Sequence, residues 1–134
     1  MSRVIEEIEN GRGETLRYRR HTNGRGMIAV GASVDPTAFV DANTYIESNV
    51  QIGKRAHIGA GCWIEHGAIV GPAAVLGSNV HLAEGAVVGV GAQVGSYSKI
   101  GIDARIGDGA KVNGDSQIAS HAVVPPRPGL ARAA

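Results

Sequence analysis

His66 and Glu84 form the pair in this sequence that is best suited to proton chemistry. His66 is the only imidazole in the stretch "CWIEHGAIVG" (residues 62–71), which is otherwise mostly apolar and glycine-rich, and residue 84 is a glutamate. A carboxylate beside an imidazole orients the ring and favours its protonated form, as a general base requires. The two residues can act together only if the fold brings positions 66 and 84 into contact.

The sequence repeats with a period of six residues. From Ile28 to Val124, every sixth residue is Val, Ile or Leu, over 17 consecutive positions. The residue two places earlier is almost always small, and the residue three places later favours Gly, Asn or Asp, which tolerate positive φ. Side chains alternate between the two faces of a strand, so the small and the branched residue point inward together. This pattern predicts short strands around a narrow interior, whereas an amphipathic helix would show a period of 3.6.

The composition restricts the class of protein. The chain has 134 residues, 20 of them glycine, with 4% aromatic residues and a net charge of +1. This charge balance gives no electrostatic footprint for nucleic acid or for an anionic membrane. No apolar run is long enough to span a bilayer, and the start, "MSRVIEEIEN", does not resemble a signal peptide. One cysteine excludes an internal disulfide framework, so we expect a soluble, cytoplasmic protein of bacterial type.

The six-residue pattern resembles that of the hexapeptide-repeat superfamily, whose fold is the left-handed parallel β-helix. The fold class expected is therefore all-β, with about 17 uninterrupted hexapeptide repeats in five or six triangular coils. The resemblance implies three hexads in each coil, so that positions 66 and 84 stand one coil apart. We expect residues 27–124 to form this helix, residues 1–26 an N-terminal cap, and residues 125–134 a flexible tail.

The two ends lie outside the repeat. "SRVIEEIEN" (residues 2–10) is compatible with a short helix turn, and "ETLRYRRHTNGRG" (residues 14–26) with an irregular strand on the first coil. The second segment is locally basic, and two interpretations remain open for its arginines: a contact to phosphate or CoA, or a solvated cap. The prolines after Val124 end the strand ladder because proline has no N–H to donate.

With three hexads in each coil, His66 and Glu84 stack in one column at a corner of the prism, and Glu47 and Glu65 form a second acidic pair. The outward side chains around this corner form one apolar patch; they are Tyr45, Trp63, Ile69 and Val87. Soluble monomers rarely expose such a patch. Since members of the superfamily usually form homotrimers, we predict a subunit interface here; stacking of Trp63 on a nucleotide base is the alternative.

The stretch "IEHGAIVG" (residues 64–71) resembles the region of the catalytic histidine in hexapeptide acyltransferases of the lipid A and sugar N-acetyltransferase kinds. This resemblance implies that His66 is a base, activating an amine or hydroxyl of a small-molecule acceptor that attacks a thioester between two subunits. The role of Glu84 is inferred from stacking. The implied donor is acyl-CoA or an acyl carrier protein, with no tightly bound cofactor. The sequence departs from the pattern at Gly67, where relatives commonly carry Asp or Asn, and in lacking a looped insertion and a donor-binding helix.

The alternatives to an acyltransferase are a scaffold and a zinc enzyme. The unbroken repeat also suits a non-catalytic β-helical scaffold or assembly subunit. Zinc chemistry of the gamma-class carbonic anhydrase kind implies two histidine ligands five residues apart, and no two of the five histidines have that spacing; they are His21, His57, His66, His81 and His121. No metal site is therefore predicted. Cys62 occupies one of the small inward positions and is interpreted as a core residue.

Overall fold

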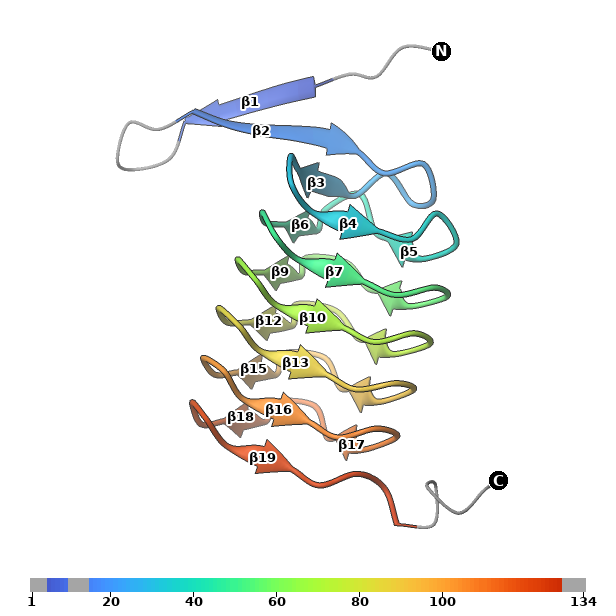
Figure 1. The fold of residues 1–134 in the computed structure, drawn as a ribbon, viewed down its shortest axis with the longest axis vertical. Coiled ribbons are helices and arrows are strands. Elements are labelled where there is room, and N and C mark those ends of the chain that lie inside the picture. Colours follow the sequence, from blue (N-terminus) through green and yellow to red (C-terminus); the bar gives the residue numbers. More distant parts are fainter. Residues whose placement is uncertain (1–4, 10–14, 129–134) are drawn as a thin grey trace.

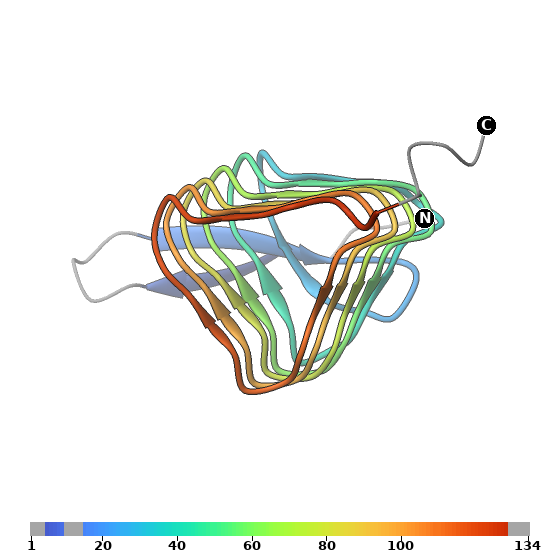
Figure 2. The same ribbon diagram turned by 90° about the horizontal axis from the view of Figure 1, so that it is seen from below.

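The computed structural model describes residues 5–9 and 15–128. Within these residues the secondary structure consists of β-strands and includes no helix. The described residues include no helix with the length and apolar character that a membrane span requires. The chain winds into a prism whose strands form three sheets, one on each side (Figure 1). Seen along the axis, the coils superimpose as a triangle (Figure 2). The predicted left-handed parallel β-helix is confirmed.

Each sheet takes one strand from every coil. The first sheet also includes the two strands that precede the prism; its strands are β1 (Ile5–Glu9), β2 (Thr15–Arg20), β3 (Met27–Ala29), β6 (Tyr45–Ile46), β9 (Trp63–Ile64), β12 (His81–Leu82), β15 (Lys99–Ile100) and β18 (Gln117–Ile118). The second sheet contains β4 (Ser33–Val34), β7 (Gln51–Ile52), β10 (Ile69–Val70), β13 (Val87–Val88), β16 (Arg105–Ile106) and β19 (Val123–Val124). The third contains β5 (Phe39–Val40), β8 (His57–Ile58), β11 (Val75–Leu76), β14 (Gln93–Val94) and β17 (Lys111–Val112).

The register of the sheets fixes which residues stack. Parallel neighbours pair each residue with its counterpart three hexads later, as with Tyr45 and Trp63 on the first sheet. Ile69 pairs with Val87 in the same way on the second sheet. The coil length implied by the resemblance is therefore correct, and positions three hexads apart share one column.

The six-period residues form the core. All are buried except Val34, Ile118 and Val124, which lie in the end coils and pack against the core while partly exposed. A fully buried Val or Ile contributes about 1.5–3 kcal/mol, so this column is the main stabilising term.

The small inward column contains three polar side chains with the same contact. Thr44 Oγ1 donates to the carbonyl oxygen of Gly59 at 2.6 Å, and Ser98 Oγ donates to that of Asn113 at 3.0 Å. Cys62 Sγ donates to the carbonyl oxygen of Gly77 at 3.0 Å. In each case the acceptor lies on the path into the next coil, so the inward polar atoms are satisfied. Burial raises the pKa of the Cys62 thiol, which agrees with a core role.

Most corner turns use a residue with positive φ three places after the core residue, as predicted. Glycine, asparagine and aspartate fill most of these positions, but four residues that the pattern did not predict adopt the same conformation; they are Arg55, Ala73, Tyr97 and His121. Two turns are built differently. Asp35 Oδ1 accepts a hydrogen bond from Thr37 N, and Asp41 Oδ1 accepts one from Asn43 N. A carboxylate that bonds the backbone two residues on replaces the left-handed residue there.

The N-terminal end is covered by a β-hairpin. Strand β1 pairs antiparallel with β2, and β2 pairs antiparallel with β3 of the first coil. The helix turn predicted within residues 2–10 is therefore wrong for residues 5–9. Ile5 and Ile8 are spaced as on a helix face. The segment is nevertheless extended, because pairing with β2 satisfies its backbone hydrogen bonds. The strand predicted on the first coil is confirmed by β2.

The loop after β2 closes the end of the prism. His21 is buried, and its Nε2 lies 2.8 Å from the carbonyl oxygen of Ala38. Arg20 Nη1 donates to the carbonyl oxygens of Arg25 and Ala42, both at 2.9 Å. These contacts favour a capping role for Arg20 over a ligand contact.

At the other end the chain follows the coil path a short distance beyond β19. Arg127 N donates to the carbonyl oxygen of Asp108 at 3.0 Å, as in an ordinary corner. Of the flexible tail predicted over residues 125–134, residues 129–134 lie outside the described residues.

Candidate functional site

His66 lies in the turn between β9 and β10, at the corner between the first and second sheets. Gly67 N donates to the carbonyl oxygen of Ser48 at 3.2 Å, and Gly85 N donates to that of His66 at 3.1 Å. These bonds stack Ser48, His66 and Glu84 in one column at the spacing of neighbouring strands, about 4.8 Å. The predicted placement of His66 next to Glu84 along the column is therefore present in the backbone.

The hydrogen-bond partner of the His66 side chain is Ser48, one coil earlier. His66 Nδ1 lies 2.9 Å from Ser48 Oγ, and no hydrogen bond joins His66 to Glu84 among the described residues. Both His66 and Glu84 are exposed, so water competes for the carboxylate. Sequence reasoning missed Ser48, although it stands three hexads before His66 in the same column. The catalytic roles of His66 and Glu84 remain predictions.

The contact to Ser48 sets how the ring could react. A serine hydroxyl can accept or donate, so it serves either tautomer of the imidazole. When Nδ1–H donates to Ser48 Oγ, Nε2 has a lone pair and no partner among the described residues. The corner is also open, because a Cβ atom placed on Gly67 would meet no atom within 4 Å. The geometry therefore leaves one ring nitrogen of His66 available to take a proton.

A ladder of rings and carboxylates runs along the first sheet beside this corner. We call Tyr45, Glu47, Trp63, Glu65 and His81 the aromatic ladder. Trp63 Nε1 donates to Glu47 Oε2 at 3.0 Å, and His81 Nε2 pairs with Glu65 Oε2. The Trp63 and His81 rings stack with centroids 4.8 Å apart and an interplanar angle of 6°. The acidic pair predicted from Glu47 and Glu65 is thus divided, since each carboxylate bonds a ring on the next coil.

The aromatic ladder extends onto the N-terminal hairpin through Tyr18. The Tyr18 hydroxyl donates to Glu47 Oε1 at 2.6 Å, and its ring meets Tyr45 edge-on at 5.6 Å. Burial, and then the hydrogen bond to Glu47, raise the pKa of Tyr18 far above its usual value. Glu47 therefore accepts a hydrogen bond from the hairpin with one carboxylate oxygen and from the next coil of the prism with the other.

Two residues of the aromatic ladder, Tyr45 and Trp63, also belong to the predicted interface patch. Tyr45, Trp63 and Ile69 are 39%, 48% and 38% exposed, while Val87 is half-buried. His81 covers one face of the Trp63 indole, so on that side a nucleotide base could not stack. The patch therefore remains a candidate surface for another subunit.

A regular spacing would have revealed the ladder in advance. Glu47 and Trp63 are 16 residues apart, as are Glu65 and His81. With three hexads in each coil, the residue after one core position lies diagonally beside the residue before the core position one coil on. In such a repeat, a carboxylate followed 16 residues later by a ring with an N–H therefore predicts a hydrogen bond between neighbouring coils.

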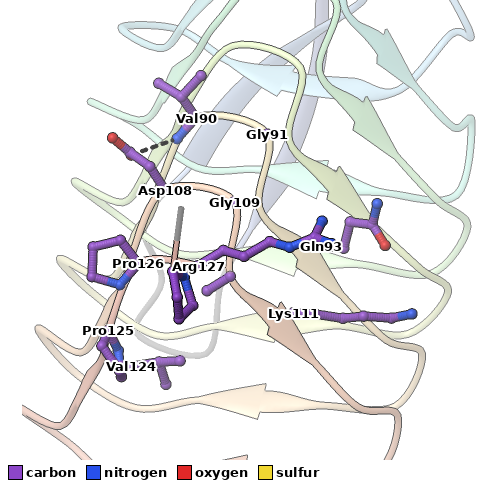
Figure 3. A pocket seen from close by; sticks show the side chains of 12 residues that line it. Val90, Gly91, Gln93, Asp108, Gly109, Lys111, Val124, Pro125, Pro126 and Arg127 are labelled. Carbon is purple, nitrogen blue, oxygen red and sulfur yellow. Dashed lines mark hydrogen bonds between the residues drawn. The ribbon is translucent and has the colours of Figure 1, made fainter. Parts of the chain in front are cut away.

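Residues 5–9 and 15–128 contain no group of three or more His, Cys, Asp and Glu side chains that could hold a metal ion. A hollow of about 930 Å³ lies at the C-terminal end of the prism, away from His66, and is lined by residues of the last coils (Figure 3).

Comparison with known families and curated proteins gave one match. The family model described as the GMPPB C-terminal domain matches residues 24–127. This description specifies a domain and no reaction. No curated protein sequence matches the chain.

Comparison with solved structures found acetyltransferases. The chain is similar to the acetyltransferase domain of PglB from Neisseria gonorrhoeae, with a TM-score of 0.71 and 21% identity, over 77% of this chain and 51% of that one. It is also similar to perosamine N-acetyltransferase from Caulobacter crescentus, with a TM-score of 0.70 and 25% identity, over 74% and 49%. That structure is a variant with a histidine replaced by asparagine, in complex with CoA and GDP-perosamine. The chain spans about half the length of these structures.

Proposed function

Because the chain belongs to the GMPPB C-terminal domain family and to the hexapeptide-repeat, acyltransferase-like superfamily, we propose that it transfers an acyl group from a thioester to an amine or hydroxyl. The observation that carries the proposal is the His66 corner. There one imidazole nitrogen is bonded to Ser48 and the other has no partner among the described residues.

The proposed step uses His66 as general base. Nε2 takes the proton from the acceptor as its nitrogen or oxygen attacks the thioester carbonyl carbon. The carbon–sulfur bond then breaks, and the departing thiolate receives the proton from the imidazolium. The products are the acylated acceptor and a free thiol. Glu84, in the same column, stabilises the imidazolium through its charge rather than by a direct hydrogen bond.

The similar structures support one donor and one acceptor for this proposal. Perosamine N-acetyltransferase was solved with CoA and a sugar nucleotide, which supports acetyl-CoA as donor and an amino sugar as acceptor. An acyl carrier protein is the other donor to test. We propose that the reaction takes place in the cytoplasm, where both kinds of donor are made.

A second copy of the chain completes the site in this proposal. His66 stands on an exposed corner, so a single chain provides only one wall for a substrate. The apolar patch of Tyr45, Trp63, Ile69 and Val87 flanks that corner and would pack against the neighbouring subunit of a homotrimer. Sedimentation of the purified chain tests this, since a monomer would leave the site open to water.

The test of the proposed function combines binding with turnover. CoA and acetyl-CoA are titrated calorimetrically into wild type and His66→Ala, and free thiol release is then measured with amino-sugar nucleotides. We expect acceptor-dependent thiol release by wild type and its loss in His66→Ala, with donor binding retained. Cys62 is buried, so it adds little background to a thiol assay. Absence of donor binding and of thiol release in wild type would overturn the proposal.

The competing function is a non-catalytic scaffold. It is favoured by the unbroken strand repeat. In this interpretation the His66 corner is part of a contact surface. A His66→Ala variant that loses its oligomeric state, in a protein with no thiol release, would support it.

A further inference from the structure

A hollow of about 930 Å³ is formed where the chain leaves the last coil. It is bounded by the exit segment 125–128, by the turns at 90–91 and 108–109, and by β14 and β17 (Figure 3). These turns lie at the corner between the second and third sheets, whereas His66 lies between the first and second. The hollow is therefore separate from the proposed acyl-transfer site.

Two glycines and one arginine explain the shape of this hollow. Gly91 and Gly109 occupy the same turn position in successive coils, and a Cβ atom on Gly91 would meet no atom within 4 Å. The exit segment follows the coil path as far as Arg127, whose N–H donates to the carbonyl oxygen of Asp108 at 3.0 Å. Arg127 thus stands next in a column whose two preceding members have no side chain.

The charges around the hollow favour an anion. Among the described residues, the side chains of Lys111 and Arg127 make no hydrogen bond or ion pair. The Arg127 side chain extends across the hollow in the direction of Gln93 (Figure 3). Asp108 is the only acidic residue of the lining, and its Oδ1 accepts a hydrogen bond from Val90 N at 2.9 Å. Two unpartnered cations therefore face the hollow, against one carboxylate that already bonds the backbone.

The rest of the lining is apolar and stiff. Val90, Val124 and Ala110 contribute apolar side chains, and three of the four exit residues are prolines, whose φ is fixed. A ligand that suits this surface has an apolar body and a compact negative group. We propose that the hollow binds an organic diphosphate. Arg127 holds the phosphate oxygens with its planar fork, and Lys111 adds a point charge.

Two kinds of small molecule carry this chemistry: CoA and a nucleoside diphosphate. The test therefore titrates inorganic pyrophosphate, GDP and CoA separately into the full chain at low salt. Arg127→Ala is compared with Arg55→Ala, which occupies the same turn column four coils earlier. Loss of a charged hydrogen bond predicts at least about tenfold weaker pyrophosphate binding in Arg127→Ala and no change in Arg55→Ala. Preference for GDP or for CoA over pyrophosphate identifies the source.

A second variant gives the opposite result. Asp108→Asn keeps an oxygen that accepts from Val90 N but removes the negative charge, so all three probes should bind more tightly. Backbone amide signals of Gly91, Gly109 and Arg127 should shift on titration. Absence of saturable binding at millimolar concentration, or equal affinities for Arg127→Ala and Arg55→Ala, would overturn the proposal. His66→Ala should leave pyrophosphate binding unchanged, so failure of acyl transfer and failure of this site are distinguishable.

Discussion

His66 and His81 lie in successive coils and are held in different ways. His81 is fixed at Nε2 by Glu65 and across one ring face by Trp63, and its side chain is 31% exposed. His66 is held only at Nδ1, by the hydroxyl of Ser48, and stands on an exposed corner. His81 lies on strand β12 and His66 lies in a turn, although both belong to the same repeat.

The difference distinguishes a structural histidine from one that can do chemistry. Each ring has one bonded nitrogen and one without a partner among the described residues, so the difference lies in access. The His81 ring is stacked on the Trp63 indole and half-buried, which leaves it little room to meet a substrate. The His66 ring is oriented by Ser48 and stands on an exposed corner, so its second nitrogen is accessible. On this comparison, the aromatic ladder organises the first sheet and His66 is the candidate base.

The largest expected effect distinguishes the two histidines by kinetics. If acyl transfer is found, His66→Gln should lower kcat by a factor of about 100 to 10,000, the usual contribution of a general base. His81→Gln should change kcat far less, because the His81 ring is stacked on Trp63 and half-buried. Steady-state kinetics of both variants, each checked for unchanged secondary structure, measure this ratio. Equal losses in kcat would contradict the separation of roles.

The next largest effect is on the free energy of unfolding and comes from Tyr18, which bonds Glu47 of the aromatic ladder. Tyr18→Phe removes the hydrogen bond to Glu47 and should lower the free energy of unfolding by about 1.5 kcal/mol, near the lower limit for a bond to a charged group. The expected loss is near that limit because Glu47 is only half-buried. Urea unfolding followed by circular dichroism measures it.

A matched change on the exposed face of the same protein provides the control. Tyr97→Phe removes a hydroxyl from a side chain that is 62% exposed, and should leave unfolding unchanged. A Tyr18→Phe variant as stable as Tyr97→Phe would show that the hydrogen bond between Tyr18 and Glu47 adds nothing to the stability of the fold.

These contrasts also define how far the sequence could be interpreted. The six-residue period determines the strands and the core, because inward positions are set by packing alone, whereas the coil length was implied by the family resemblance. Side-chain pairing was less predictable: Ser48 rather than Glu84 bonds His66, since both candidates stand one coil away and local rotamers decide. The strand at residues 5–9 was missed because its pairing partner lies outside the repeat.

A smaller effect tests how His66 is oriented. Ser48→Ala removes one neutral hydrogen bond, which is worth about 0.5–1.5 kcal/mol, so kcat should fall by a factor of about 2 to 13. Ser48 is a positioning residue, so the variant should also alter the pH profile of kcat. Ser48→Thr keeps the hydroxyl and should restore both. A Ser48→Ala enzyme with wild-type kcat and pH profile would show that the ring needs no orientation.

The smallest expected effect at neutral pH is on stability and concerns a third histidine, His21, which is buried in the N-terminal cap. Burial lowers the pKa of His21 from its usual 6.5, although the hydrogen bond to the Ala38 carbonyl opposes the shift. Below pH 6.5 the unfolded chain therefore binds more protons than the folded chain at this position. The contribution of His21 to stability is complete above pH 6.5 and is lost as the pH falls toward the folded pKa.

His21→Gln keeps a donor for Ala38 but cannot titrate, so it should weaken the loss of stability on acidification. Urea midpoints at about pH 7.5 and about pH 5 measure this difference for wild type and variant. His66→Gln is the control, because His66 is exposed and lies outside the N-terminal cap. If His21→Gln and His66→Gln change the pH dependence equally, the cap histidine is not protected by burial, and the distinction among the three histidines would rest on hydrogen bonding alone.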